Sequence, residues 1–143
     1  MKHMVVDASM ALAWLFERQK ADEIDCAEHA LLALNDVCAL VPSLWHTEVA
    51  NAILVSERRH VVTESQVFEY LAKLSILPIE TDNETVISRR DAVMALAREY
   101  KLSAYDATYL DLALRTNAVL ATFDIQLAHA MRRTGGIVFG DRI

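Results

Sequence analysis

The chain has 143 residues, of which 54% are hydrophobic, and its formal net charge is −6. This length and apolar content fit one compact domain, over residues 1–143, with enough material for a core. The sequence has no run of about 18 uncharged apolar residues, which excludes a membrane-spanning helix. The opening MKHMVVD reaches an aspartate too early for a secretory signal peptide. We therefore expect a soluble, cytoplasmic protein.

The net charge and the two cysteines bear on nucleic-acid binding and on metal or redox function. Proteins that bind phosphate backbones usually carry a basic face, whereas this chain is acidic and has six of its ten arginines in pairs, at 58–59, 89–90 and 132–133. We interpret these pairs as solvated ends of helices. Cys26 and Cys38 lack metal or redox spacing, so we expect buried, reduced thiols. An acidic protein can still cut nucleic acid if part of its acidity forms a metal site.

Short β-branched runs alternate with longer helical stretches along the chain. In chain order, the pattern predicts a strand at His3–Val6, helices at 9–16 and 20–34, a strand at Cys38–Val41, helices at 44–58 and 63–74, a strand at 76–79, helices at 83–100 and 103–115, a strand at 118–121, a helix at 124–133 and a last strand at 137–139. Ser43 is the expected cap of the third helix, and Pro78 favours an edge position or a strand end.

Strands that alternate with helices indicate parallel pairing and right-handed crossovers. The predicted fold class is therefore α/β, a three-layer α/β/α sandwich with helices on both faces of a central parallel sheet. Ligands of such sheets bind beyond the carboxyl ends of the strands. Acidic residues at those ends can converge, whereas acids on outer helix faces cannot.

Two of the predicted strands end at an aspartate. Asp7 follows the first strand directly, and Asp124 follows the strand at 118–121 through Thr122 and Phe123. Either aspartate can act as the N-cap of the next helix, and that role stays open. Two strand exits that each carry an aspartate nevertheless favour a shared functional site.

Two further acids lie on predicted helices. Glu48 and Asn51 share a helix face with apolar residues, which is a costly place for a carboxylate unless a partner pairs with it. Asp106 stands three residues after Ser103 in a capping-box pattern, and a carboxylate at a helix N-terminus also suits a metal–phosphate site. Asp111 lies about 140° further round the same helix, so we leave it outside the site.

The chemistry of this acidic set is that of a hard divalent cation. Four carboxylates without a histidine or thiolate partner suit Mg²⁺ or Mn²⁺ better than zinc; they are Asp7, Glu48, Asp106 and Asp124. Such a site hydrolyses phosphodiester bonds by activating a water, without a protein nucleophile. The chain has no H-E-x-x-H, P-loop or G-x-G-x-x-G motif, which argues against a zinc protease and a nucleotide cofactor.

Four segments resemble, in order and separation, the four motifs of PIN-domain ribonucleases, and most closely those of the bacterial VapC toxins: VVDASMALAW, PSLWHTEVANAI, LSAYDATYLDLA and VLATFDIQLAHA. The resemblance covers nearly the whole chain. It implies a sheet of four or five strands and a metal-dependent endoribonuclease that acts on RNA. The metal ligands would then be the four acids named above.

The resemblance also implies roles for residues beside the acids. Ser9 and Thr122 would support the metal ligands with their hydroxyls, and Asn51 would be a site residue next to Glu48. Phe123 is a bulky residue immediately before Asp124, and we expect it to alter the shape of the groove.

The partners implied by the resemblance are a second copy of the chain, in a homodimer, and a cognate antitoxin of the VapB type. A basic antitoxin segment would complement the acidity of the chain. The favoured interpretation is therefore the toxin of a type II toxin–antitoxin pair. A PIN nuclease of RNA processing or decay without an antitoxin would use the same site and stays open. A non-catalytic acidic module that binds a basic partner is the third alternative.

Overall fold

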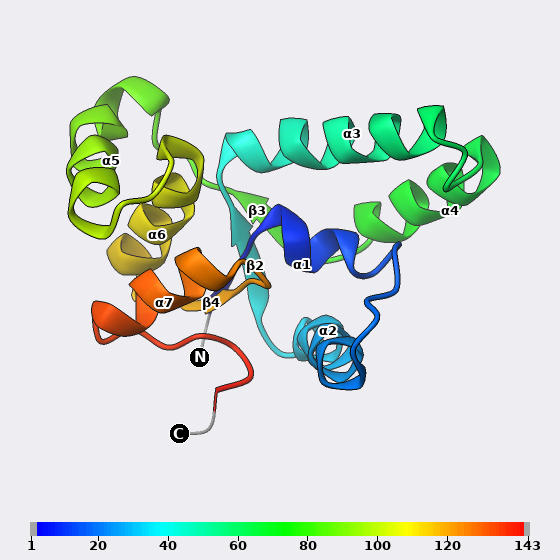
Figure 1. The fold of residues 1–143 in the computed structure, drawn as a ribbon, viewed down its shortest axis with the longest axis horizontal. Helices are drawn as coiled ribbons and strands as arrows, with labels where there is room; N and C mark the ends of the chain where they lie inside the picture. Colours follow the sequence, from blue (N-terminus) through cyan, green and yellow to red (C-terminus); the bar gives the residue numbers. More distant parts are fainter. Residues whose placement is uncertain (1–2, 142–143) are drawn as a thin grey trace.

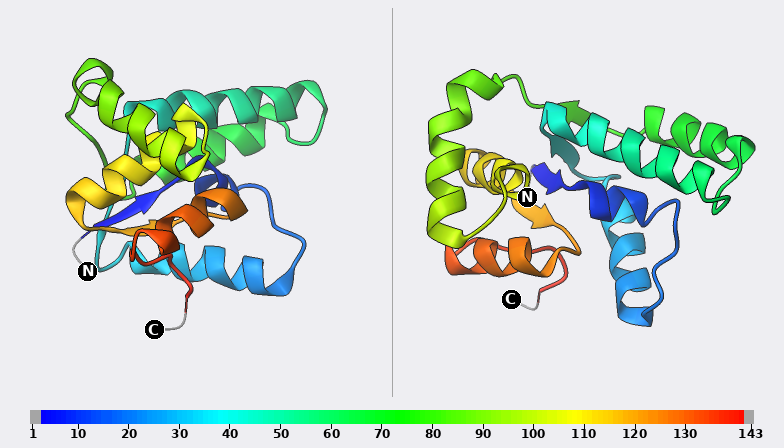
Figure 2. Two further views of the ribbon diagram at one scale, coloured as in Figure 1. Left: turned by 60° about the vertical axis from the view of Figure 1, so that its left-hand side comes forward. Right: turned by 45° about the horizontal axis from the view of Figure 1, so that its top comes forward.

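The computed structural model describes residues 3–141 and contains a four-stranded parallel sheet with strand order β3-β2-β1-β4. Helices cover both sides of the sheet: α5, α6 and α7 lie on the left in Figure 1, α1, α2 and α4 on the right, and α3 runs across the top (Figures 1 and 2). The predicted three-layer α/β fold with a parallel sheet of four or five strands is confirmed, and the sheet has four. The elements are β1 (His3–Val6), α1 (Ala8–Leu12), α2 (Ala21–Ala33), β2 (Cys38–Val41), α3 (Ser43–Arg58), α4 (Glu64–Ser75), β3 (Ile79–Thr81), α5 (Val86–Tyr100), α6 (Ala104–Thr116), β4 (Val119–Ala121) and α7 (Ile125–Arg133).

The central strand β1 is apolar because both of its faces are covered. Met4, Val5 and Val6 are at most 1% exposed, as expected of a parallel strand packed against helices on both sides. The next residue, Asp7, still donates its backbone N–H to the carbonyl of Ala121 at 3.2 Å. This bond fixes the end of β1 beside the end of β4.

The edge strand β3 begins three residues later than the sequence pattern predicts. Pro78 has no N–H to donate, and its carbonyl accepts from the N–H of Ala39 at 2.9 Å, so pairing with β2 starts at Ile79. The edge position predicted from Pro78 is confirmed.

The predicted strand at 137–139 is wrong. Only an isolated bridge joins Val138 to Leu120, with one backbone bond on either side of it. Gly140 then turns the chain away with φ +96°, a conformation that glycine adopts at little cost. The contact therefore does not extend into a ladder.

Several helix bounds also differ from the prediction, and three of the differences have a local cause or context. Pro42 takes the cap position of α3 and Ser43 is its first helical residue. Helix α5 begins at Val86, where the side chain of Thr85 accepts from the N–H of Ser88 at 3.1 Å. Helix α1 ends at Leu12 instead of reaching residue 16, ahead of the polar segment at 17–20.

Cys26 and Cys38 are free thiols, and each is partly rather than fully buried. Among the helices of residues 3–141, none is long and apolar enough to cross a bilayer.

Candidate active site

The parallel sheet places the ends of β1 and β4 at one edge, where the side chain of Asp7 is 5% exposed. Its Oδ1 accepts from the hydroxyl of Ser9 at 2.7 Å and from the N–H of Met10 at 3.0 Å. Its Oδ2 accepts from the hydroxyl of Thr122. Asp7 is therefore both the cap of α1 and a fixed carboxylate at the edge of the sheet.

The loop after β4 repeats this arrangement. The Thr122 hydroxyl that donates to Asp7 also accepts from the N–H of Asp124 at 2.9 Å. The Asp124 carboxylate accepts from the N–H of Leu127 at 2.8 Å and caps α7. The Ser9 hydroxyl accepts from the N–H of Phe123 at 3.0 Å. The hydroxyls of Ser9 and Thr122 thus tie the two strand exits together.

Helices α6 and α3 bring the other two acids to this edge. Helix α6 packs against β1 and β4, and α3 packs against α1. The N–H of Asp106 donates to the Ser103 hydroxyl at 3.1 Å, which is the N-terminal half of the predicted capping box. Glu48 is partly buried on α3, and its Oε1 accepts from the phenol of Tyr109 on α6 at 2.5 Å. We call Asp7, Glu48, Asp106 and Asp124 the acid site.

The charges of the acid site act on one another. Burial raises the pKa of Asp7 to about 6, and the charge of Asp106 adds to the rise. The hydrogen bonds from Thr122, Met10 and Ser9 lower this pKa but do not cancel the effect of burial. Burial is also the main cause that raises the pKa of Asp106, followed by the charges of Asp124 and Glu48. Asp106 is therefore the common neighbour of the other three acids, and their charges oppose ionisation as like charges do.

Tyr109 contacts the acid site, and the sequence analysis missed it. It is 2% exposed, and its pKa lies well above the usual range because of burial, the hydrogen bond to Glu48 and the charges of Glu48 and Asp7. It consequently stays protonated and donates to Glu48 at neutral pH. The available signal was its three-residue spacing from Asp106, which puts both side chains on one face of α6.

The acid site offers the oxygen donors that Mg²⁺ and Mn²⁺ prefer. Within residues 3–141, no salt bridge reaches these four carboxylates. Within the same range, no three His, Cys, Asp or Glu side chains are spaced as a ready-made metal-ligand set. Donor chemistry and unbalanced charge therefore fit a divalent cation, and binding one requires the side chains to draw closer together.

Asp111, only five residues from Asp106, has a different environment. Its two carboxylate oxygens accept from Arg89 at 2.7 and 3.0 Å, and Oδ2 also accepts from Arg115 at 3.2 Å. Arg115 in turn donates to Asp82 at 2.6 Å. Asp111 thus lies in an ion-pair network outside the acid site, and Arg89 is not the solvated helix end that the sequence pattern indicated.

Asn51 is exposed on α3, one turn after Glu48.

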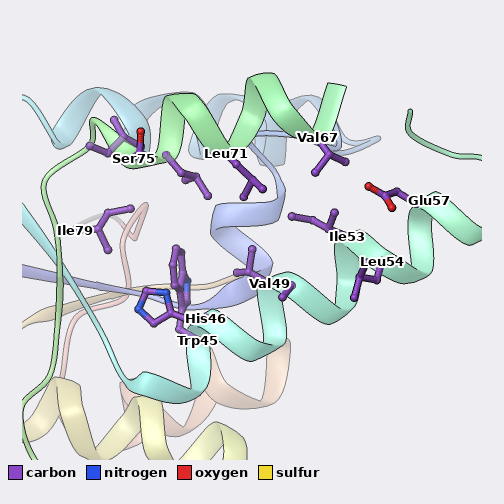
Figure 3. Close-up of a pocket in the computed structure, with 13 residues that line it drawn as sticks. Trp45, His46, Val49, Ile53, Leu54, Glu57, Val67, Leu71, Ser75 and Ile79 are labelled. Carbon is purple, nitrogen blue, oxygen red and sulfur yellow. The ribbon is translucent and has the colours of Figure 1, made fainter. Parts of the chain in front are cut away.

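On the side of α3 that faces α4, an apolar groove of about 520 Å³ runs past Trp45, Val49 and Ile53 (Figure 3). Glu57 is the acidic residue in its lining. The four residues of the acid site lie outside the lining of this groove. Its apolar walls suit packing contacts better than phosphate chemistry.

Comparison with known proteins agrees with this arrangement. The family model of the PIN domain matches residues 4–132. The chain belongs to the PIN-domain family. PIN domains are generally nucleases that use divalent metal ions, so membership indicates nuclease chemistry for a chain that presents these acids at the carboxyl edge of its sheet.

Solved structures share this PIN fold. The crystal structure of PAE2754 from Pyrobaculum aerophilum is 24% identical, with a TM-score of 0.67 over 96% of this chain and 84% of that one. The crystal structure of FitAcB from Neisseria gonorrhoeae is 14% identical, with a TM-score of 0.63 over 96% of both chains. No curated protein matches the chain in sequence.

Proposed function

We propose that this PIN domain is a Mg²⁺- or Mn²⁺-dependent endoribonuclease whose metal ligands are Asp7, Glu48, Asp106 and Asp124. The observation that carries the proposal is the junction of the two strand exits, where the Thr122 hydroxyl donates to Asp7 and accepts from the N–H of Asp124. The charges of the acids also reach one another: after burial, which is the main cause of both shifts, the charges of Asp124 and Glu48 raise the pKa of Asp106, and the charge of Asp106 adds to the rise in the pKa of Asp7. Carboxylates gathered in this way are unfavourable alone and become favourable when a cation binds between them.

The chain's own residues hold the acids in place for this chemistry. Ser9 and Thr122 orient Asp7 through its two oxygens, and Tyr109 orients Glu48. Outer hydrogen bonds of this kind fix metal ligands and tune their affinity. A bound divalent cation would lower the pKa of an attacking water and stabilise the leaving oxygen of a phosphodiester.

Cleavage of single-stranded RNA tests the nuclease proposal. Purified protein should cut an end-labelled oligoribonucleotide with Mg²⁺ or Mn²⁺, stop in EDTA, and recover when metal is added in excess. Asp106→Asn, purified in the same way, should be inactive and thereby exclude a contaminating nuclease. Equal cleavage by wild type and Asp106→Asn would refute the assignment of the acid site.

We further propose that the chain is the toxin of a type II toxin–antitoxin pair, as a homodimer inhibited by an antitoxin of the VapB type. The four motif segments, which resemble those of VapC toxins, and the net charge of −6, which suits a basic partner, support this role. Expression of the chain alone should slow growth, and co-expression of a small reading frame found beside its gene should restore it. Normal growth with an active, well-expressed nuclease would favour RNA processing or decay instead.

A further inference from the structure

A hollow of about 530 Å³ opens beside the acid site, between α1 and the polar segment that leads to α2. Its lining includes Ser9, Leu12, Ala13, Phe16, Arg18 and Glu23. Ser9 joins the hollow to the acid site directly, because it lines the hollow and its hydroxyl donates to Asp7 at 2.7 Å. A molecule in the hollow would therefore lie next to any phosphodiester held at the acids.

Arg18 is held rigidly at the wall of this hollow. Its guanidinium lies over the ring of Phe123, 4.5 Å from the ring centroid, and Nη2 and Nε donate to Oε2 of Glu23 at 2.7 and 3.2 Å. The side chain is still 36% exposed. Phe123 immediately precedes Asp124, and its N–H is bound by Ser9, so the Arg18–Phe123 stack is fixed to the same loop as the acid site.

These contacts favour one class of ligand. The charge of Arg18 is already balanced by Glu23, which makes it a weak phosphate anchor. Phe123 covers one face of the guanidinium, and the side chain is still 36% exposed, so the face turned away from Phe123 is the one on which a base would stack. Unpaired nucleobases stack on guanidinium planes and aromatic rings, and the ring of Phe16 supplies a second apolar wall. The volume of the hollow falls in the range of pockets that hold small molecules, roughly 300–1,000 Å³.

We propose that this hollow receives an unpaired nucleobase of the RNA next to the cleaved bond, stacked on Arg18. The proposal rests on the ribonuclease function proposed above and adds a subsite that selects single-stranded substrate, because a base inside a duplex cannot enter. Arg18 and Phe16 contact the base, and Phe123 and Glu23 are positioning residues that hold the guanidinium flat.

Paired substitutions at Arg18 separate stacking from charge. Arg18→Gln removes the guanidinium, whereas Arg18→Lys keeps the charge and loses the plane. Stacking of one base corresponds to about 5- to 150-fold in affinity. Both variants should therefore raise KM, and the Kd for RNA measured in EDTA by fluorescence anisotropy, by a factor in that range. The value of kcat should stay within about threefold of wild type, because the lost contact binds the substrate and the transition state equally.

Arg98→Gln, on the exposed face of α5, is the matched control. It should leave KM, kcat and the Kd for RNA unchanged.

An abasic scan of the oligoribonucleotide identifies the base. One abasic position beside the cut should raise the wild-type KM as much as Arg18→Gln does, and on that substrate Arg18→Gln should have no further effect. Retention of the wild-type KM by Arg18→Lys, or an Arg18→Gln effect that persists on every abasic substrate, would overturn the base subsite. Failure of the wild type to cleave RNA would reject the ribonuclease proposal alone, since the binding measurements in EDTA decide the subsite independently.

Discussion

The phenol of Tyr109 on α6 donates to Oε1 of Glu48 on α3 at 2.5 Å, across 61 residues of sequence. Tyr109 also lies one turn after Asp106. The bond therefore sets the position of one acid relative to another, and it joins two helices that each carry a single acid of the site.

Tyr109→Phe should weaken cleavage without abolishing it. The substitution keeps the buried ring and removes a hydrogen bond to a charged group, which contributes about 1.5–3 kcal/mol. We expect kcat/KM to fall about tenfold, because that factor corresponds to about 1.4 kcal/mol, and the urea midpoint to fall as well. An unchanged kcat/KM in a destabilised protein would mean that Tyr109 is structural and does not position Glu48.

Asp106→Asn and Asp111→Asn form a matched pair on one helix. Asp106→Asn should lower kcat by two or more orders of magnitude, in the range of about 10²–10³ found when preorganised charge stabilisation is lost. Asp111→Asn should keep most of the activity per folded molecule and lose about 2 kcal/mol of stability, because it weakens the pairs with Arg89 and Arg115. Single-turnover cleavage and urea unfolding measure the two effects. An Asp111→Asn protein as inactive as Asp106→Asn would show that the wrong face of α6 has been assigned to the acid site.

Thr122→Val tests the hydroxyl that bridges Asp7 and the N–H of Asp124. Valine has the same shape but neither donates nor accepts, so both bonds are lost. Loss of such outer partners typically costs about 10- to 100-fold in metal affinity or activity. We expect the Mn²⁺ concentration for half-maximal cleavage to rise by a factor in this range. Thr122→Ser keeps the hydroxyl and should remain close to wild type; equal defects in both variants would show that the packing of this side chain matters and that its hydroxyl does not orient Asp7.

The sheet and the strand-end acids were predictable because their signals are local. The run at His3–Val6 followed by Asp7, and the run before Asp124, are readable from single segments of the sequence. Capping and site roles looked like alternatives in the sequence, yet the geometry of Asp7 is compatible with both. One oxygen of Asp7 accepts the N–H of Met10 while its other oxygen accepts from Thr122.

What the sequence could not supply are partners from distant segments. Glu48 and Tyr109 meet only because α3 and α6 pack around the same edge of the sheet. The predicted solvation of Arg89 was wrong for the same reason, since Asp111 is 22 residues away along the chain. Arg18 over Phe123 is a third such contact, and no periodicity in either segment indicates it.

The acid site should make stability depend on pH in a defined direction. The pKa of Asp7 rises from 3.8 to about 6 on folding, and that of Asp106 rises as well. The folded state therefore binds more protons than the unfolded state between these values, so the free energy of unfolding falls as pH increases from about 4 to about 6 and stays lower above it. In EDTA, the contribution of the acid site should therefore make the Tm of the wild type lower at pH 7.5 than at pH 5.

Metal should reverse this penalty, because it binds only the folded site. A hundredfold excess over the dissociation constant adds about 2.7 kcal/mol, which is a rise in Tm of about 10 °C at roughly 4 °C per kcal/mol for a domain of this size. Asp106→Asn removes one of the repelling charges, so it should melt above wild type in EDTA at pH 7.5, gain less from Mn²⁺, and differ less from wild type near pH 5. The Ser103 cap is retained in this variant, because the Asp106 backbone N–H donates to it and not the side chain. Thermal scans of both proteins, with EDTA and with Mn²⁺, measure these shifts; a wild type whose Tm is indifferent to Mn²⁺ would show that these four acids do not form a metal site.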